Sequence, residues 1–356
     1  MNKESQVPIF EAPDAKLDLH ATHVKAAAEA RGIPTVTKIV QAGGKRNTWL
    51  TFHIGGQEFF YARGMLLVQG SDDWGRIGLN VNHDAALLIG HKFRCKQYLA
   101  DKGYSVPAGQ FFRRRKLEDA YASFKDFSGP ICVKPNHGTE GRCVFPSITD
   151  EHWFKTAIDR VAARFPNILI EESVVGEHFR FFYVEPEVVG IRCGRPCSVV
   201  GDGGASLLEL ANAKNAERVQ RDLPTHPPFA INDAMGEYLE RHGRALDDVP
   251  AAGERVFLSG VSNATAGADS YLFWEEVHPS YREIVAKACQ DLPGLHYSGV
   301  DLVIEDYTVP ATDNNYWLLE FNTSPALLSF YYPWEGQKVD VAARILDMLE
   351  RHYPTA

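Results

Sequence analysis

Three side chains that offer oxygen atoms lie in two segments expected to pair as neighbouring strands. Asp301 is at the head of the apolar segment 300–304, and Glu320 and Asn322 end the next such segment. Because side chains alternate between the faces of a strand, Glu320 and Asn322 point to the same face. Mg²⁺ prefers such oxygen ligands and leaves its remaining positions to phosphates and water. The spacing indicates a magnesium site, although exposed strand ends and a capping aspartate would account for the same residues.

A second group of residues suits phosphate binding. Lys134 ends an expected strand, 131–134, and a loop with Gly138 and Gly141 follows it. Backbone N–H groups in such a loop can surround phosphate oxygens, and a lysine adds a point charge. The loop is not a Walker A motif, and Gly44-Lys45 lacks the glycine five residues earlier that this motif needs. A lysine at a strand end is also often simply solvated, so both interpretations stay open.

The elements that position these residues are mixed helices and hairpins. A helix over 20–30 and a hairpin of 49–54 with 58–62 across Gly55-Gly56 predict a small N-terminal α/β domain. Further helices are expected over 92–102, 150–163, 279–292 and 337–352, and a polar helical stretch runs through Arg218. Strands are expected over 168–171, 179–185, 188–192 and 256–258. This mixture indicates α+β layers and not a doubly wound sheet.

Composition narrows the class of function. The chain has 356 residues, 45% of them hydrophobic, with a formal net charge of −9. An acidic chain does not suit binding to a nucleic-acid backbone, so we expect small-molecule chemistry and no nucleic acid. Residues 1–15 contain no apolar stretch of signal-peptide length and no later segment is long enough to span a membrane, so a cytoplasmic protein is expected. Six cysteines in so long a chain do not form a disulfide framework or a metal motif.

The order of these features resembles that of the ATP-grasp ligases, from about Asn80 to the C-terminus. The resemblance implies an α+β ATP-grasp fold, in which two α+β subdomains grip ATP, preceded by the small N-terminal α/β domain. It divides the chain into a lead-in domain at 1–88, an N-subdomain with a phosphate lid loop at 89–170, and a C-subdomain with the metal site at 171–356.

The resemblance also assigns roles to individual residues. Lys92 on the opening helix and Lys134 would contact phosphate, and Arg180 would lie near the transferred phosphate. The family usually has an acidic residue where His178 stands, beside the ribose. The full implied ATP site consists of Lys92, Lys134, Gly138, Gly141, Glu171, Glu172, Val174 and His178, with backbone groups near Glu172 and Val174 reading the adenine. The implied metal ligands are Asp301, Glu320 and Asn322.

Within the superfamily, the sequence is most similar to cyanophycin synthetase and to the glutathione-synthetase half of bifunctional glutathione enzymes. Three stretches carry this similarity: 195–215, 249–258 and 262–279. Ser259 stands where these relatives usually have an arginine, and Ala268 where they have a glycine, so the carboxylate substrate is left open. Arg192 and Arg195 are candidates for holding a substrate carboxylate or an acyl phosphate through forked hydrogen bonds, although a surface ion pair is an equal alternative.

The activity that the resemblance implies is ATP-dependent formation of an amide bond through an acyl phosphate, with release of ADP and phosphate. ATP and Mg²⁺ are the expected cofactors, with two metal ions and Mn²⁺ as a substitute. The expected substrates are a carboxylate and an amine from amino acids or short peptides. A kinase-like phosphotransferase, a ligase that modifies a ribosomal precursor peptide and a non-catalytic nucleotide binder are the alternatives, and association as a homodimer is left open.

Overall fold

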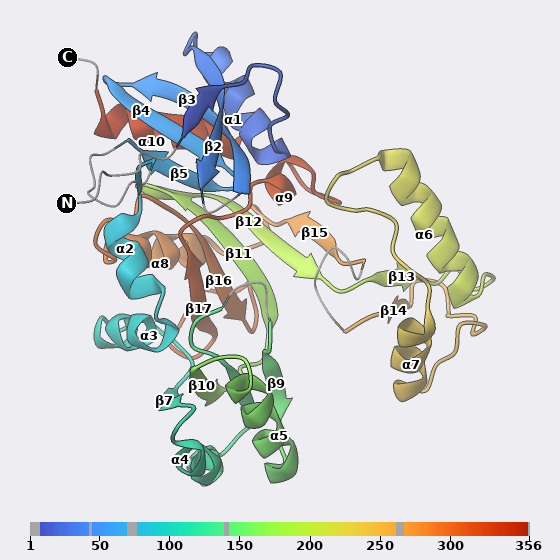
Figure 1. The fold of residues 1–356 in the computed structure, drawn as a ribbon. Helices are drawn as coiled ribbons and strands as arrows, with labels where there is room; N and C mark the ends of the chain where they lie inside the picture. The colour runs from blue at the N-terminus through green and yellow to red at the C-terminus, as the bar shows by residue number, and fades with distance from the viewer. Residues whose placement is uncertain (1–7, 43–44, 70–76, 139–141, 261–266, 355–356) are drawn as a thin grey trace.

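The computed structural model describes residues 8–42, 45–69, 77–138, 142–260 and 267–354, and Figure 1 shows their arrangement. The helices are α1 (Leu19–Glu29), α2 (His83–Ile89), α3 (Lys92–Asp101), α4 (Leu117–Ala122), η1 (Ser123–Asp126), α5 (Glu151–Ala162), α6 (Leu207–Arg221), α7 (Asp233–Arg241), α8 (Pro279–Gln290), α9 (Leu328–Tyr331) and α10 (Val341–His352). The strands are β1 (Ile9–Glu11), β2 (Thr35–Ala42), β3 (Lys45–Ile54), β4 (Gln57–Ala62), β5 (Met65–Val68), β6 (Leu79–Asn80), β7 (Gly109–Arg113), β8 (Ile131–Pro135), β9 (Phe145–Ile148), β10 (Asn167–Glu172), β11 (Glu177–Val184), β12 (Glu187–Arg195), β13 (Ser198–Val200), β14 (Arg255–Phe257), β15 (Asp269–Leu272), β16 (Tyr297–Ile304) and β17 (Tyr316–Asn322).

The N-terminal segment forms a sheet in the order β1-β2-β3-β4-β5-β6, and every neighbouring pair is antiparallel. Asp18 caps the start of helix α1. Its carboxylate accepts from the N–H of Ala21 at 3.1 Å, which satisfies one free donor of the first turn. Helices α1 and α10 pack together, so the first and last helices share a side of this sheet. One buried cluster joins apolar residues of α1 and β3–β5 to α10 and to Phe182 and Val184 of β11.

A smaller sheet, β7-β10-β8-β9, forms the lobe at the bottom of Figure 1 together with α4 and α5. Helix α5 buries Phe154, Ala157, Ile158 and Val161, which recur at intervals of three and four and therefore form one apolar face. That face packs on β8 and β10. The lobe thus has its own core and carries Lys134 at the end of β8.

The central sheet has the order β15-β12-β11-β16-β17. Phe179, Phe181 and Tyr183 of β11 point to a core on one face, which α8 covers. The alternate residues Phe182 and Val184 point to the other face and pack against α10. Because the period is two, His178 and Arg180 lie on this second face as well, beyond the part that the N-terminal and C-terminal helices cover.

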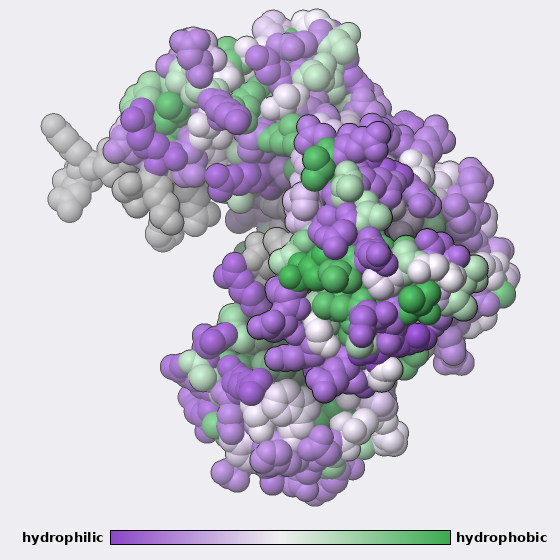
Figure 2. Space-filling model, turned by 90° about the vertical axis from the view of Figure 1, so that its right-hand side faces the viewer, coloured by the Kyte–Doolittle hydropathy of each residue, from purple (hydrophilic) through white to green (hydrophobic). Residues whose placement is uncertain are grey.

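An arm built from β13, β14, α6 and α7 extends to the right in Figure 1. Helix α6 begins with a capping box, in which the Ser206 hydroxyl accepts from Glu209 N–H and the Glu209 carboxylate accepts from Ser206 N–H. Figure 2 looks onto this side, whose surface is mostly hydrophilic with apolar residues gathered near its middle. The large apolar side chains exposed on the arm are Val200, Leu208, Val219, Val249 and Phe257.

The predicted α+β mixture is confirmed, and so is the hairpin across Gly55-Gly56. The helix predicted over 337–352 begins later, at Val341, because the Asp340 carboxylate caps it by accepting from the N–H of Ala343. The sequence patterns missed several short elements, among them α2, α7 and β7. Within the described ranges, no helix is long and apolar enough to cross a lipid bilayer.

Candidate active site

Four charged residues form a row across the central sheet. Arg192 of β12 lies opposite Arg180 of β11, Arg180 lies opposite Asp301 of β16, and Asp301 lies opposite Glu320 of β17. Directly opposed residues of antiparallel strands point to the same face, so four strands present four charges side by side. The row is positive at the β12 end and negative at the β17 end.

Hydrogen bonds hold the middle of this row. The Arg180 guanidinium donates to both carboxylate oxygens of Asp301, from Nε to Oδ1 at 2.8 Å and from a terminal nitrogen to Oδ2 at 2.7 Å. Asp301 is the chief reason that the pKa of Arg180 is raised further above its usual value. The Asn322 side-chain amide nitrogen lies 3.5 Å from Asp301 Oδ2. The three predicted metal ligands, Asp301, Glu320 and Asn322, therefore lie on one sheet face.

Helix α3 brings Lys92 to the negative end of the row, where its ammonium group forms an ion pair with Glu320. The start of α3 is fixed to the end of β8 through Asn136, which is fully buried. Asn136 Oδ1 accepts from the N–H of Phe93 at 3.0 Å, and its main-chain oxygen accepts from the N–H of Lys92 at 3.4 Å. His137 contacts the carbonyl oxygen of Gly90 at 2.5 Å. These contacts tie the element that carries Lys92 to the one that carries Lys134.

A buried triad of Glu171, Lys96 and Lys134 lies between α3, β8 and β10. Lys96 Nζ lies 2.6 Å from Glu171 Oε2, and Lys134 forms an ion pair with the other carboxylate oxygen. Burial lowers the pKa of Lys96 to about 8, even though Glu171 acts to raise it. Burial acts to raise the pKa of Glu171, but the two lysines hold it below its usual value, so the carboxylate is ionised at neutral pH.

Electrostatics connect the triad with the row. Burial acts to lower the pKa of Lys134, but Glu171 and, more weakly, Glu320 raise it overall. Neighbouring groups desolvate His178 enough to lower its pKa, with smaller and opposite contributions from Asp301 and Lys134, although the residue is exposed on β11. Lys92, the partner of Glu320, stands one helical turn before Lys96 of the triad on α3, and His178 stands two residues before Arg180 on the same face of β11. The row, the triad and His178 therefore belong to one site.

Arg192 is the unsatisfied member of the row. Its Nε is buried and has no hydrogen-bond partner among the described residues, and no carboxylate in the described part of the chain pairs with it. Burial lowers the pKa of Arg192 to about 10, and the like charge of Arg180 adds to this effect. Two adjacent guanidinium groups, one of them with a free buried donor, form a position that favours an anion.

The structure places Arg195 elsewhere. Arg195 donates to Glu177 at distances of 3.0 to 3.2 Å and lies over the rings of Tyr271 and Phe273. Three residues beyond Arg192 on the same strand, it lies on the opposite face, which carries Cys193 and the core under α8. The structure thus does not bring Arg195 to the row.

The predicted adenine segment connects β10 with β11. Glu172 is the exposed last residue of β10, and its N–H already donates to Ala108 at 2.9 Å. Val174 follows it in the half-buried connection, and His178 is exposed on β11. The expected phosphate loop is described only in part, because Gly141 lies outside the described residues. Gly138 is exposed three residues after the end of β8, and a Cβ there would make only ordinary contacts.

Two residues of this site were missed from the sequence. Lys96 stands four positions after Lys92, so both lie on one face of α3, and this spacing was an available signal. Asn136 is part of the segment that was singled out for its lysine and glycines, but no local pattern distinguishes a buried asparagine from a solvated one. The triad as a whole could not be found locally because Glu171 is 75 positions from Lys96.

Comparisons with known proteins agree with this geometry. The chain is 30% identical over 272 residues to the glutathione biosynthesis bifunctional protein GshAB of Clostridium perfringens, covering 74% of this chain and 34% of that protein. It is 30% identical over 285 residues to the protein of the same name from Mannheimia succiniciproducens, covering 76% and 37%. The chain thus spans about a third of the length of these curated relatives. No protein-family model matches.

Among solved structures, a bifunctional glutathione synthetase from Pasteurella multocida superposes with a TM-score of 0.67 and 22% identity. The superposition covers 94% of this chain and 45% of the synthetase. The chain has the predicted α+β ATP-grasp fold, and the predicted resemblance to ATP-grasp ligases is confirmed.

Proposed function

We propose that this ATP-grasp protein is a ligase that joins a carboxylate to an amine at the expense of ATP. The observation that carries the proposal is the row from Arg192 to Glu320, which places an anion-binding end beside a cation-binding end on one sheet face. Such a site can hold a substrate carboxylate and the γ-phosphate together. The relatives' role in glutathione biosynthesis supports amino acids or short peptides as the substrates.

The negative end of the row suits the predicted metal. Asp301 and Glu320 each face a cationic side chain, Arg180 and Lys92. Positive charge is therefore already stabilised here, and with Asn322 the residues offer the oxygen ligands that Mg²⁺ requires. Two Mg²⁺ ions, or Mn²⁺ in their place, would neutralise phosphate charge when bound.

The surrounding residues suit ATP. We assign phosphate contacts to Lys92 and Lys134, and a covering role to the loop with Gly138 and Gly141. The ion pair with the buried Glu171 holds the Lys134 side chain in place. The connection with Glu172 and Val174 would bind adenine, and His178 would contact the ribose. Because the N–H of Glu172 already donates to Ala108, we assign the adenine contacts to Val174 and to the exposed side of Glu172.

The chemistry follows from the charges. A carboxylate does not react with an amine at neutral pH, because oxide is too poor a leaving group. A carboxylate oxygen first attacks the γ-phosphorus, the bond to the bridging oxygen breaks, and ADP leaves. Lys92, Lys134 and Arg180 would stabilise the negative charge of this step, and the free donor of Arg192 would orient the anion. The amine nitrogen then attacks the acyl carbon, loses a proton, and phosphate departs.

A kinase-like phosphotransferase needs the metal ligands and lysines but no second anion position. The free buried donor of Arg192 next to Arg180 therefore favours the ligase. Modification of a ribosomal precursor peptide would use the same chemistry on a larger substrate. The roles of the site residues, the three-domain division, the cytoplasmic location and association as a homodimer remain predictions.

The test is phosphate release from ATP across a matrix of amino-acid and dipeptide pairs, with mass spectrometry of the products. We expect phosphate release that depends on one carboxylate and one amine, and a condensed product smaller than the sum of the two by one water. Glu320→Gln is the control for contaminating ATPase activity, because it removes a metal ligand. ATP-dependent formation of a phosphorylated product in place of an amide would contradict the proposal.

A further inference from the structure

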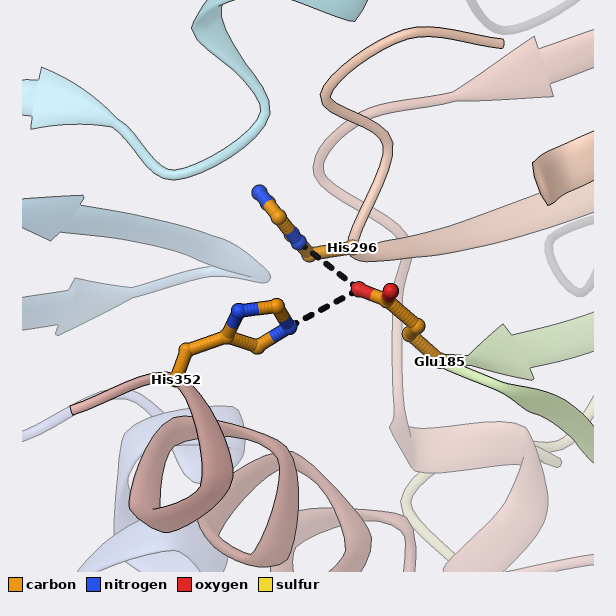
Figure 3. Close-up of side chains that lie close together, drawn as sticks. All are labelled: Glu185, His296 and His352. Atoms are coloured by element: carbon orange, nitrogen blue, oxygen red, sulfur yellow. Dashed lines mark hydrogen bonds and ion pairs between the residues drawn. The ribbon is translucent and has the colours of Figure 1, made fainter. Parts of the chain in front are cut away.

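A group of two histidines and one carboxylate lies outside the candidate active site. Glu185 directly follows β11, His296 directly precedes β16, and His352 ends α10. Figure 3 shows that both imidazole rings point at the same carboxylate. His296 Nδ1 lies 2.8 Å and His352 Nε2 lies 2.9 Å from Glu185 Oε2. Three segments far apart in the sequence thus present one ligand atom each.

The backbone fixes these three segments. Val184 and Tyr297 are paired residues of β11 and β16, and the N–H of Glu185 donates to the carbonyl oxygen of His296 at 2.9 Å. The side-chain oxygen of Asn82, which is fully buried, accepts from the N–H of His296 at 2.8 Å. On the α10 side, the Arg351 guanidinium donates to the main-chain oxygen of Glu185 and not to its carboxylate.

The spacing of the ligand atoms suits a small divalent ion. The three atoms all lie within 4.8 Å of one another. Tetrahedral Zn²⁺ with ligands at about 2.0–2.1 Å places neighbouring ligand atoms about 3.3–3.4 Å apart. Each histidine nitrogen would therefore have to move about half an ångström away from the oxygen. Side-chain rotation supplies that shift, because 28% of His296, 35% of Glu185 and 34% of His352 is exposed.

The chemistry of the ligands selects the type of metal. Imidazole nitrogen and carboxylate oxygen together suit Zn²⁺ and its neighbours in the first transition row, whereas Mg²⁺ and Ca²⁺ prefer oxygen ligands alone. The exposure of all three side chains leaves room for water as a fourth ligand.

The cluster is separate from the ATP site. Glu185 follows Arg180 by five residues along β11, which corresponds to about 16 Å at the rise of a strand. An ion there would join the end of α10 to the β11–β16 pair and would not touch the phosphates. We propose that Glu185, His296 and His352 bind one divalent transition-metal ion, with Zn²⁺ as the probe, which fastens the C-terminal helix to the central sheet.

The experiment uses tag-free, chelator-treated protein. Added Zn²⁺ should bind at about one ion per chain, measured by equilibrium dialysis with elemental analysis, and should raise the Tm by a few degrees, because an ion that binds only the folded state stabilises it. Excess Mg²⁺ should not displace the bound Zn²⁺, because Mg²⁺ prefers oxygen ligands alone. Co²⁺ should give the visible absorption of a four- or five-coordinate site.

Variants decide between this cluster and other zinc ligands. Glu185→Gln, His296→Gln and His352→Ala should each lose the bound ion, the Tm shift and the Co²⁺ spectrum. Two controls should keep them: Glu187→Gln, an exposed acid on β12, and His53→Ala, an exposed histidine on β3. If the wild type binds no Zn²⁺, or if the folded His352→Ala and Glu185→Gln variants bind one ion as tightly as the wild type, the proposal is wrong.

Discussion

Replacing Glu171 by glutamine should cost a large part of the stability of the fold, because this carboxylate neutralises two buried lysines. Only 3% of the Glu171 side chain is exposed, against 6% for Lys96 and 11% for Lys134. Breaking a buried ion pair by removing one partner costs about 3–5 kcal/mol. Lys96 can relieve part of this cost by losing its proton, since its pKa is already about 8. We therefore expect a loss of about 3 kcal/mol at pH 7.

The pH dependence of this loss has a defined sign. Without Glu171, the pKa of Lys96 in the folded state falls further below 8, because the attraction that opposed burial is gone. At a pH between the Lys96 pKa of the variant and that of the wild type, the folded wild type binds one proton more than the folded variant. Stability rises with pH wherever the unfolded state binds more protons, so the variant gains on the wild type as pH increases. The difference in unfolding free energy should be smaller at pH 9 than at pH 7.

Urea unfolding followed by circular dichroism measures both effects. The matched control is Glu172→Gln, one residue further on, whose exposed side chain should contribute less than about 0.5 kcal/mol. The double variant Lys96→Met with Glu171→Gln should recover part of the lost stability, because it removes one of the two buried lysine charges that the single variant leaves without a carboxylate partner. A loss below about 1 kcal/mol at pH 7, or equal losses in the Glu171 and Glu172 variants, would refute the reasoning.

Three further predictions concern the site and the arm. Glu320→Gln and Asn322→Ala should abolish phosphate release at saturating Mg²⁺ while the circular dichroism spectrum is kept; a near-normal rate in either would show that the metal assignment is wrong. Lys134→Ala should raise the Kd for ATP, measured by calorimetry, by about tenfold or more. The control Lys45→Ala should leave the Kd unchanged, because Lys45 belongs to no matched motif. Equal effects of the two substitutions would show that Lys134 does not contact phosphate. Burial lowers the pKa of His226 to about 4, so on acidification the unfolded chain takes up a proton before the folded protein does. The free energy of unfolding should therefore fall by about 2 kcal/mol between pH 6.5 and 4. A His226→Gln variant whose Tm falls with pH as steeply as that of the wild type would contradict this.

The sequence predicted the parts of the site that depend on local geometry. The period of a strand is enough to place Glu320 and Asn322 on one face, and the structure agrees. The helix that carries Lys92 and the strand that ends near Lys134 were also predicted correctly. Each of these depends on residues a few positions apart, where hydrophobic period and capping signals act.

The row itself could not be predicted, because it depends on strand order and register. Arg180 meets Asp301 only because β16 pairs with β11 in a register that sets the two residues opposite each other, and they are 121 positions apart in the sequence. A shift of one residue would turn Arg180 into the core. Arg192 and Arg195 were grouped because the strand was expected to end at Arg192. In the structure β12 continues to Arg195, and two residues three positions apart on one strand point to opposite faces.

The most direct test of the ligase proposal is interception of the acyl phosphate with hydroxylamine. With ATP, Mg²⁺ and the carboxylic acid identified in the substrate matrix, but no amine, added hydroxylamine should give a hydroxamate together with sustained formation of ADP. Glu320→Gln should give neither product. A turning-over enzyme that yields a stable phosphate ester, and neither hydroxamate nor amide, would contradict the ligase reaction while leaving the ATP-grasp fold in place.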